Sequence, residues 1–186
     1  MHDIRPKRAT YADILAAPPN MVAELFDGVL YTMPRPRPKH TRAYSRLGMV
    51  IGAPFDLGSN GPGGWCILSE PELHLGEDVA VPDLAGWHVE RMPVQPETAF
   101  YETTPDWVCE ILSPSTRRLD QVIKREVYAR HGVSHLWHLD PEAKLLEVFE
   151  LAGGKWLLLR TFTDGDDVAA APFAALTFRL GQVLAV

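Results

Sequence analysis

The apolar positions of this chain follow two different periods. Between residues 40 and 55 they recur at helical spacing, which predicts an amphipathic helix; the residues are Tyr44, Leu47, Ile51 and Phe55. A shorter helix is expected over residues 10–16. A third is predicted for about residues 117–131, because Ser115 or Thr116 can cap its start and Gly132 is well placed to end it.

Runs rich in β-branched and aromatic residues predict strands before and after the third helix. Two such runs flank Asp27-Gly28, a dipeptide typical of a β-hairpin turn. Further strands are predicted over residues 65–75 (broken near Pro71), 79–89, 106–112, 134–140, 144–151 and 155–162. This order of elements predicts an α/β or α+β domain with a mixed sheet. With 186 residues, we expect residues 1–186 to form one domain.

The composition indicates where the protein is expected to be located, and it argues against some classes of protein. No apolar run approaches the roughly 20 residues of a membrane span, and the basic N-terminus is not followed by a signal-peptide apolar region. A cytoplasmic protein is therefore expected. The two cysteines, Cys66 and Cys109, are expected to be reduced and buried, and their spacing gives no support to a zinc site.

The charges are unevenly distributed. A formal net charge of -6 argues against indiscriminate electrostatic binding to nucleic acid. Residues 34–55 nevertheless carry five basic side chains and no acidic one: Arg35, Arg37, Lys39, Arg42 and Arg46. They form either a solvated loop and helix face or a clamp on a nucleic-acid backbone, to which Arg117, Arg118 and Arg125 would add if they share that side. No element that would read bases can be identified.

Three residues combine charge with strand-like neighbours: Asp83 after Pro82, Glu110 in an apolar run, and Lys124 in the helix that follows. Two carboxylates on adjacent strands would suit Mg²⁺ or Mn²⁺. Such a metal can polarise a phosphoryl oxygen and help to deprotonate an attacking water. A nearby ammonium would position or activate that water and offset charge developing in the transition state.

Each of these residues also has a structural interpretation. Asp83 could be a turn residue at a strand entry, and Glu110 a carboxylate paired inside the fold. Lys124 follows Asp120 by four residues, the favourable spacing for an ion pair on a helix surface. For Lys124 to reach the site, its helix must pack back over the sheet through an apolar side that Val122, Ile123 and Val127 would supply.

The same residues match a known pattern. "VPDLAGW" and "PDWVCEILSPSTRRLDQVIKREVYARHGVSHLWHLDP" closely resemble the Uma2 (DUF820) family, which is regarded as a family of endonucleases. The family pattern has a PD, an E-x-x-S-P-S-T element, D-x-x-x-K, Y-x-x-x-G-V and W-x-x-D-P. Here it falls on Pro82-Asp83, Glu110, Ser113 to Thr116, Asp120 with Lys124, Tyr128 with Gly132-Val133, and Trp137 with Asp140-Pro141. With the hairpin and the C-terminal stretch, the resemblance spans nearly the whole chain.

The resemblance implies a restriction-endonuclease-like fold of the PD-(D/E)xK superfamily, with a central mixed sheet flanked by helices. It implies Asp83 and Glu110 as ligands of Mg²⁺ or Mn²⁺ and Lys124 as the catalytic lysine. Leu112 occupies the position where the superfamily usually has that lysine, so Lys124 would have to reach in from the helix. Glu24 and His40 match a recurrent acid and a recurrent histidine of the family. They could be an additional ligand and a phosphate contact, or could serve the hairpin and the helix structurally.

These observations predict a metal-dependent endonuclease acting on nucleic acid, with DNA the expected substrate. A homodimer is expected, because two symmetric sites are the simplest way to cut both strands of a duplex. One alternative is a nucleic-acid-binding or protein-interaction module that keeps the fold without cleaving. Another is a metal-dependent hydrolase of a different phosphoester.

Overall fold

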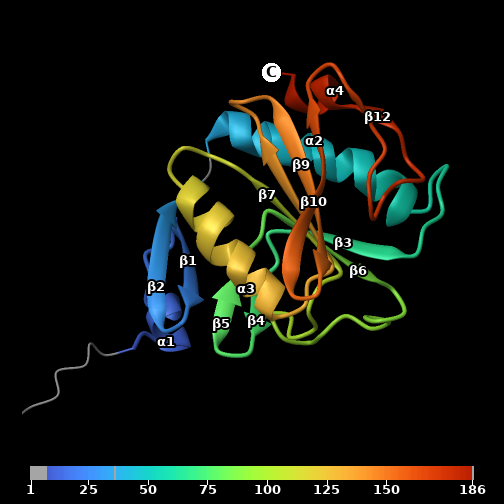
Figure 1. Cartoon of the computed structure of the whole chain (residues 1–186). Helices are drawn as coiled ribbons and strands as arrows, with labels where there is room; N and C mark the ends of the chain where they lie inside the picture. Colours follow the sequence, from blue (N-terminus) through green and yellow to red (C-terminus); the bar gives the residue numbers. More distant parts are fainter. Residues whose placement is uncertain (1–7, 36, 186) are drawn as a thin grey trace, which may run out of the picture.

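The computed structural model describes residues 8–35 and 37–185 (Figure 1). The basic N-terminal stretch therefore lies almost wholly outside the described residues, as does Pro36 within the predicted basic segment. In the described part of the chain, no helix has both the length and the apolar character needed to cross a membrane. The cytoplasmic location and the single-domain organisation stay predictions.

The N-terminal hairpin is confirmed. After the short helix α1 (Tyr11–Leu15), strands β1 (Met21–Phe26) and β2 (Val29–Pro34) pair antiparallel around Asp27-Gly28. Both turn residues have positive φ, 51° at Asp27 and 79° at Gly28, the conformation that a two-residue hairpin turn of this kind requires. Strand β1 also pairs with β5 (Asp78–Ala80) and β5 with β4 (Leu73–Leu75), giving a four-stranded sheet of order β2-β1-β5-β4.

The central sheet is mixed, as predicted. Its six strands are ordered β10-β9-β8-β7-β6-β3, and only β7 and β8 run parallel. Their bounds are β3 (Trp65–Ser69), β6 (Leu84–His88), β7 (Trp107–Ile111), β8 (His135–Asp140), β9 (Leu145–Ala152) and β10 (Lys155–Thr163). Sheet order and helix placement together confirm the predicted fold class.

Each of two predicted strands is divided at a proline, and its two parts belong to different sheets. The stretch expected over residues 65–75 gives β3 to the central sheet and β4 to the four-stranded one. The stretch expected over 79–89 divides in the same way between β5 and β6, so the prediction of one strand there was wrong. Pro71 and Pro82 lie at the two breaks, where the chain leaves one ladder, because proline has no N–H to donate to a sheet. Asp83 thus lies in a connection between two sheets, directly before β6.

Helices cover both faces of the central sheet (Figure 1). Helix α2 (Pro38–Phe55) buries Leu47 and Ile51 in one apolar cluster, which Trp107 and Trp137 of the sheet complete. On the other face lie the π-helical segment η1 (Leu119–Lys124) and α3 (Arg125–Arg130). The C-terminal β11 (Asp167–Val168), β12 (Phe178–Arg179) and α4 (Leu180–Leu184) were not predicted.

The winding of η1 corrects one detail of the predicted third helix. Val122, expected on the packing side, is 56% exposed, whereas Val127 is buried and Ile123 partly buried. A π-helix has more residues per turn than an α-helix, so the side chains on its inner face follow a different spacing. Asp120 and Lys124 are the residues that η1 buries beside Leu119.

Candidate active site

Strand β7 has two chemically different faces. Trp107, Cys109 and Ile111 join the apolar cluster under α2, because alternate residues of a strand point to opposite sides. Glu110 points to the other side, toward η1 and α3, and is only 2% exposed. A carboxylate buried this deeply needs a positive or hydrogen-bonding partner.

Lys124 supplies that partner. Its ammonium nitrogen lies 2.9 Å from Glu110 Oε1, 3.0 Å from Glu24 Oε1 and 3.8 Å from Asp120 Oδ1. It also donates to the carbonyl oxygen of Val81, at 3.2 Å. The interpretation of Lys124 as a solvated helix residue paired only with Asp120 is therefore wrong, since the side chain is buried and links three segments of the fold.

Glu24 brings the N-terminal hairpin into this network. Its Oε1 accepts a hydrogen bond of 2.7 Å from the backbone N–H of Val81, beside the ion pair with Lys124. Its Oε2 is buried and has no hydrogen-bond partner within the described residues. Sequence reasoning named Glu24 only as an additional candidate, and the structure brings it into direct contact with the predicted lysine.

Asp83, directly before β6, lies beside the end of β7. Its Oδ2 accepts a 2.7 Å hydrogen bond from the backbone N–H of Ile111, and its Oδ1 lies 3.3 Å from His40 Nε2. These two contacts hold the carboxylate between the end of β7 and the start of α2. Burial alone would lower the pKa of His40, but the hydrogen bond and charge of Asp83 outweigh it and raise that pKa.

Burial and charge strongly perturb the titration of this centre. Burial raises the pKa of Glu110 well above its usual value, although the charge of Lys124 opposes that rise. Burial also raises the pKa of Asp120, to about 6. For Lys124, burial alone would lower the pKa, but Glu110 and Glu24 outweigh it and raise that pKa well above its usual value. Lys124 is thus a permanent cation at neutral pH.

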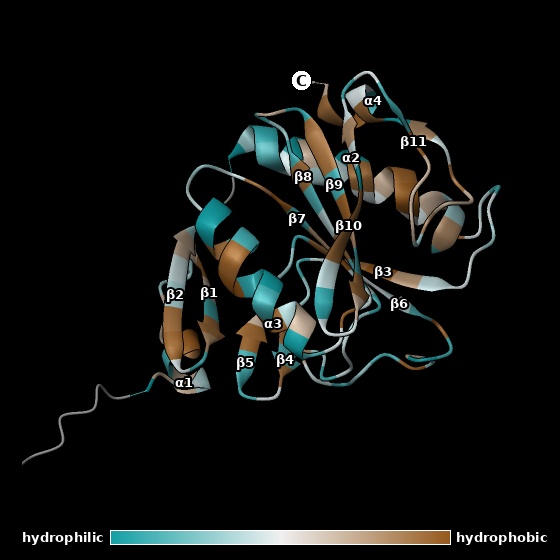
Figure 2. Cartoon of the chain, in the orientation of Figure 1, coloured by the Kyte–Doolittle hydropathy of each residue, from teal (hydrophilic) through white to brown (hydrophobic). Residues whose placement is uncertain are grey.

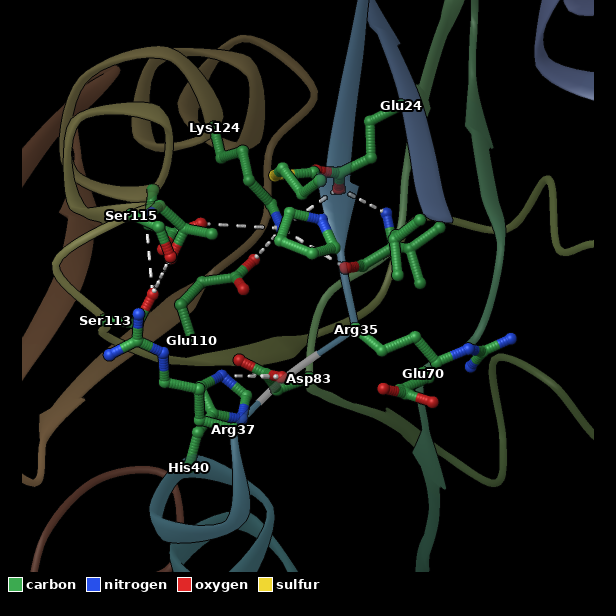
Figure 3. Close-up of a pocket in the computed structure, with 16 residues that line it drawn as sticks. Glu24, Arg35, Arg37, His40, Glu70, Asp83, Glu110, Ser113, Ser115 and Lys124 are labelled. Atoms are coloured by element: carbon green, nitrogen blue, oxygen red, sulfur yellow. Dashed lines mark hydrogen bonds and ion pairs between the residues drawn. The ribbon is translucent and has the colours of Figure 1, made fainter. Parts of the chain in front are cut away.

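These side chains converge on a pocket of about 370 Å³. Figure 3 shows Lys124, Glu24 and Glu110 pointing toward one another, with Asp83 and His40 beside them. Arg35 and Arg37 line the same pocket, as do the hydroxyl residues Ser113, Ser115 and Thr116. The arrangement joins carboxylates, one buried ammonium and exposed guanidinium groups in a single concave site, where perturbed titratable groups favour a catalytic role.

Comparison with known proteins identifies the family. A family model for Uma2, described as "Putative restriction endonuclease", matches residues 9–182. The chain belongs to the Uma2 family. The resemblance carried by Asp83 and the E-x-x-S-P-S-T element is therefore confirmed.

A solved structure shows the same fold. It is described as the crystal structure of "a putative nuclease belonging to DUF820" from Anabaena variabilis ATCC 29413. It superposes with a TM-score of 0.76 at 21% sequence identity, over 94% of this Uma2 chain and 97% of the other. No curated protein sequence matches the chain.

The other predicted basic residues of this Uma2 protein differ in their surroundings. Three have partners: Lys39 pairs with Glu142 at 3.2 Å, Arg117 with buried Asp140 at 2.6 Å, and Arg46 donates to backbone carbonyls near the end of α4. Arg42 and Arg118 are exposed. Arg125 lies over the ring of Phe149, 4.5 Å from its centroid.

The donor set for a divalent cation in this Uma2 site is small. Among residues 8–35 and 37–185, no three His, Cys, Asp or Glu side chains are grouped closely enough to hold a metal ion. Mg²⁺ is commonly held by only one or two carboxylates, together with waters and substrate phosphates. Asp83 and Glu110 line one pocket and are the two carboxylates predicted for that smaller set, and Glu24 Oε2 is a further buried oxygen in the same pocket without a hydrogen-bond partner among the described residues.

Sequence reasoning gave no role to Tyr128. Its hydroxyl donates a 2.5 Å hydrogen bond to Glu110 Oε1, and its ring is fully buried. The only available signal was its place in the Y-x-x-x-G-V element, four residues after Lys124. Tyr128 and Lys124 thus hold the same oxygen of Glu110, which fixes the orientation of this carboxylate.

Proposed function

We propose that this chain is a metal-dependent endonuclease that hydrolyses phosphodiester bonds of nucleic acid, with DNA as the expected substrate. The observation that carries the proposal is the ammonium of Lys124, buried between Glu110 and Glu24 in the pocket that Asp83 also lines. Membership of a family described as "Putative restriction endonuclease", and a structural neighbour described as "a putative nuclease", support the reaction class.

In this proposal Asp83 and Glu110 hold Mg²⁺ or Mn²⁺. The bound cation would supply Lewis-acid stabilisation of the phosphoryl oxygens and lower the pKa of a water. Lys124 stays protonated beside Glu110 and Glu24, so it acts as a hydrogen-bond donor and a fixed positive charge. It orients the attacking water or a phosphoryl oxygen and offsets charge in the transition state, while another group accepts the proton.

The pocket mouth suits a charged polymer. Arg35 and Arg37 line it and are exposed, so they are free to contact backbone phosphates, and His40 beside Asp83 is a further phosphate contact. Exposed Arg42 and Arg118 are added as outer contacts. Lys39, Arg46 and Arg117 are assigned weaker contributions, because each already has a partner within the fold. For cleavage of both strands of a duplex, we propose a homodimer with two symmetric sites.

Nicking of supercoiled plasmid DNA tests the proposal. The wild-type chain is incubated with Mg²⁺, Mn²⁺ or a chelator, beside Asp83→Asn, Glu110→Gln and Lys124→Met. Activity should require the metal and fall by at least ~100-fold in each variant, a loss typical of removing one catalytic group. Glu126→Gln, an exposed carboxylate on α3, is the matched control and should retain activity. Activity that persists in Asp83→Asn and Glu110→Gln would contradict the assignment.

A second candidate function is a nucleic-acid-binding or protein-interaction module that does not cleave. Two observations favour it: no group of three metal-ligand side chains occurs among the described residues, and Lys124 already pairs with Glu110. Metal-independent DNA binding that weakens in Arg35→Ala and Arg37→Ala, without nicking under any metal condition, would support the binding module over the enzyme.

A further inference from the structure

A second pocket lies beside the catalytic pocket, and we name it the side pocket. Its volume is about 340 Å³, a size at which clefts hold small ligand groups. Four residues line both pockets: Val22, Arg35, Glu70 and Val81. Figure 3 shows Arg35 and Glu70 next to Asp83. A polymer with one phosphate in the catalytic pocket can therefore place the neighbouring group of the same strand in the side pocket.

The boundary between the two pockets is tied to Asp83. The backbone N–H of Glu70 donates a 3.0 Å hydrogen bond to the carbonyl oxygen of Asp83. Arg35, on the same boundary, is exposed and has no ion-pair or hydrogen-bond partner within the described part of the chain. A guanidinium group that is free in this way binds phosphate oxygens through two parallel hydrogen bonds. A phosphate held by Arg35 would have one of its adjoining nucleosides at the side pocket.

The remaining walls of the side pocket are mainly apolar. They are formed by α1, by the turn that follows it and by the start of β1, with Leu15, Pro18, Pro19 and Met21 among the lining residues. Helix α1 lies against the hairpin (Figure 2), where Ile14 packs into a small apolar cluster. Leu15 is instead 70% exposed. Apolar side chains in a pocket are one means by which proteins hold a base that has left the stack.

Glu72 adds a carboxylate whose position is fixed to this apolar pocket. Its Oε1 accepts a 2.8 Å hydrogen bond from the hydroxyl of Tyr11 and lies 2.8 Å from His74 Nε2. The ring of His74 is held in turn, because it stacks on Phe100 with centroids 3.8 Å apart and meets the edge of Tyr11 at 4.7 Å. Glu72 Oε2 has no hydrogen-bond or ion-pair partner among the residues that the structure describes. A carboxylate held in this way is a ready acceptor for N–H groups of a ligand.

These features together define the chemistry of the ligand. Apolar walls suit a flat ring, the carboxylate of Glu72 suits an N–H donor, and the guanidinium of Arg35 suits a phosphate next to that ring. A nucleotide whose base carries an amino group has all three. Cytosine presents its N4 amino group, for which Glu and Asp are the usual acceptors, whereas thymine has a carbonyl oxygen at that position.

We propose that the side pocket binds one unstacked, amino-bearing base of the substrate strand, beside a phosphate held by Arg35. A base that is stacked and paired inside a duplex cannot enter such a pocket, so the substrate is single-stranded or locally unpaired nucleic acid. This inference deepens the proposed function and rests on it. Binding is measured in a chelator, without cleavage, so a chain that does not nick DNA and a chain without a base preference are separate results.

Fluorescence anisotropy with labelled strands of ten deoxycytidines or ten deoxythymidines tests the base preference of the full chain. The wild type should bind the cytosine strand about tenfold more tightly, as expected for one hydrogen bond to a charged group, and should bind it more tightly than the same strand in a duplex. Glu72→Gln should lose most of this preference, because an amide can also donate to the thymine carbonyl. Glu126→Gln is the matched control and should keep it. Equal binding of both strands by the wild type would overturn the proposal, and so would a preference that persists in Glu72→Gln.

The apolar wall has a test of its own. Leu15→Ala should weaken binding of both strands about fivefold, roughly the effect of losing contact with one CH₂ group, and should leave the preference for cytosine unchanged. Leu57→Ala, at an apolar side chain that is 78% exposed and does not line the side pocket, should bind as the wild type does. Unchanged binding in Leu15→Ala would contradict the proposal. An arginine-rich peptide that binds the wild type but not Glu72→Gln, with no base preference in either chain, would assign the side pocket to a basic protein segment and overturn it.

Discussion

The two faces of β7 are built on opposite principles. On the α2 side, Trp107, Cys109 and Ile111 are fully buried in an apolar cluster. On the η1 side, Glu110 is equally buried but meets Lys124, with Glu24 close by. One strand therefore carries both the packing that stabilises the fold and the charged group that would perform chemistry.

This difference has an energetic consequence. Burial of apolar groups stabilises the fold by itself, whereas a buried ion pair roughly offsets its own desolvation and is rarely a net gain. The charged face of β7 therefore contributes little to the free energy of unfolding, which is typical of functional sites. Variants on the two faces should therefore respond differently to pH.

The largest effect is expected for Lys124→Met. Removal of the ammonium leaves Glu110 and Glu24 without their cation, and breaking a buried pair in this way costs about 3–5 kcal/mol. The loss should shrink at low pH, where the carboxyl groups take up protons. Urea unfolding at neutral and acidic pH measures it, with exposed Lys155→Met as control. A cost below about 1 kcal/mol at neutral pH would contradict the buried position of Lys124.

A comparable effect of different character is expected for Ile111→Ala on the apolar face. Truncation of a fully buried isoleucine costs about 2–5 kcal/mol through lost transfer energy and a cavity. Because no charge is involved, this loss should be the same at neutral and acidic pH. Urea unfolding of Ile111→Ala at neutral and acidic pH measures this loss. A pH-dependent cost would show that the two faces are coupled.

A smaller effect is expected for Asp120→Asn. In the folded chain burial raises the pKa of Asp120 to about 6, above the value of about 3.9 in an unfolded chain. The folded state therefore binds this proton more tightly, so its contribution to stability is complete below pH ~4 and is lost as pH rises through about 6. The variant should lose less stability than the wild type over this window. If the free energy of unfolding changed with pH by the same amount in the wild type and in Asp120→Asn, the raised pKa of Asp120 would be excluded.

The smallest effect is expected for Val122→Lys. Its side chain is 56% exposed on η1, and surface substitutions usually change stability by less than about 0.5 kcal/mol. Val127→Lys on the same helical stretch should be strongly destabilising, because Val127 is only 1% exposed. Thermal unfolding of both variants tests the π-helical winding. If this stretch were an unbroken α-helix with Val122 on its inner face, Val122→Lys would instead be strongly destabilising.

Much of the fold and of the site was predictable because its signals are local. The hairpin follows from Asp27-Gly28, the strand β7 from its apolar run, and the site from the E-x-x-S-P-S-T element at Glu110. The contact of Lys124 with Glu24 joins residues 100 positions apart in sequence, so no local periodicity could predict it. The same holds for the hydrogen bond from Tyr128 to Glu110, which depends on how α3 packs on the sheet.

The π-helical winding was also beyond local analysis. The pattern of Val122, Ile123 and Val127 suits an α-helix, and tertiary packing of Asp120 and Lys124 toward the sheet overrides it. The changes of sheet at Pro71 and Pro82 are similar, because proline signals a break without saying which sheet receives the next strand.

The central proposal is that Glu110 on the charged face of β7 and Asp83 beside the end of that strand together hold a divalent cation. Calorimetric titration of the chain with Mn²⁺ at neutral pH tests it most directly. We predict one Mn²⁺ per chain, lost in both Asp83→Asn and Glu110→Gln and retained in Glu126→Gln. Equal Mn²⁺ binding by all four proteins, or none by the wild type, would contradict the claim.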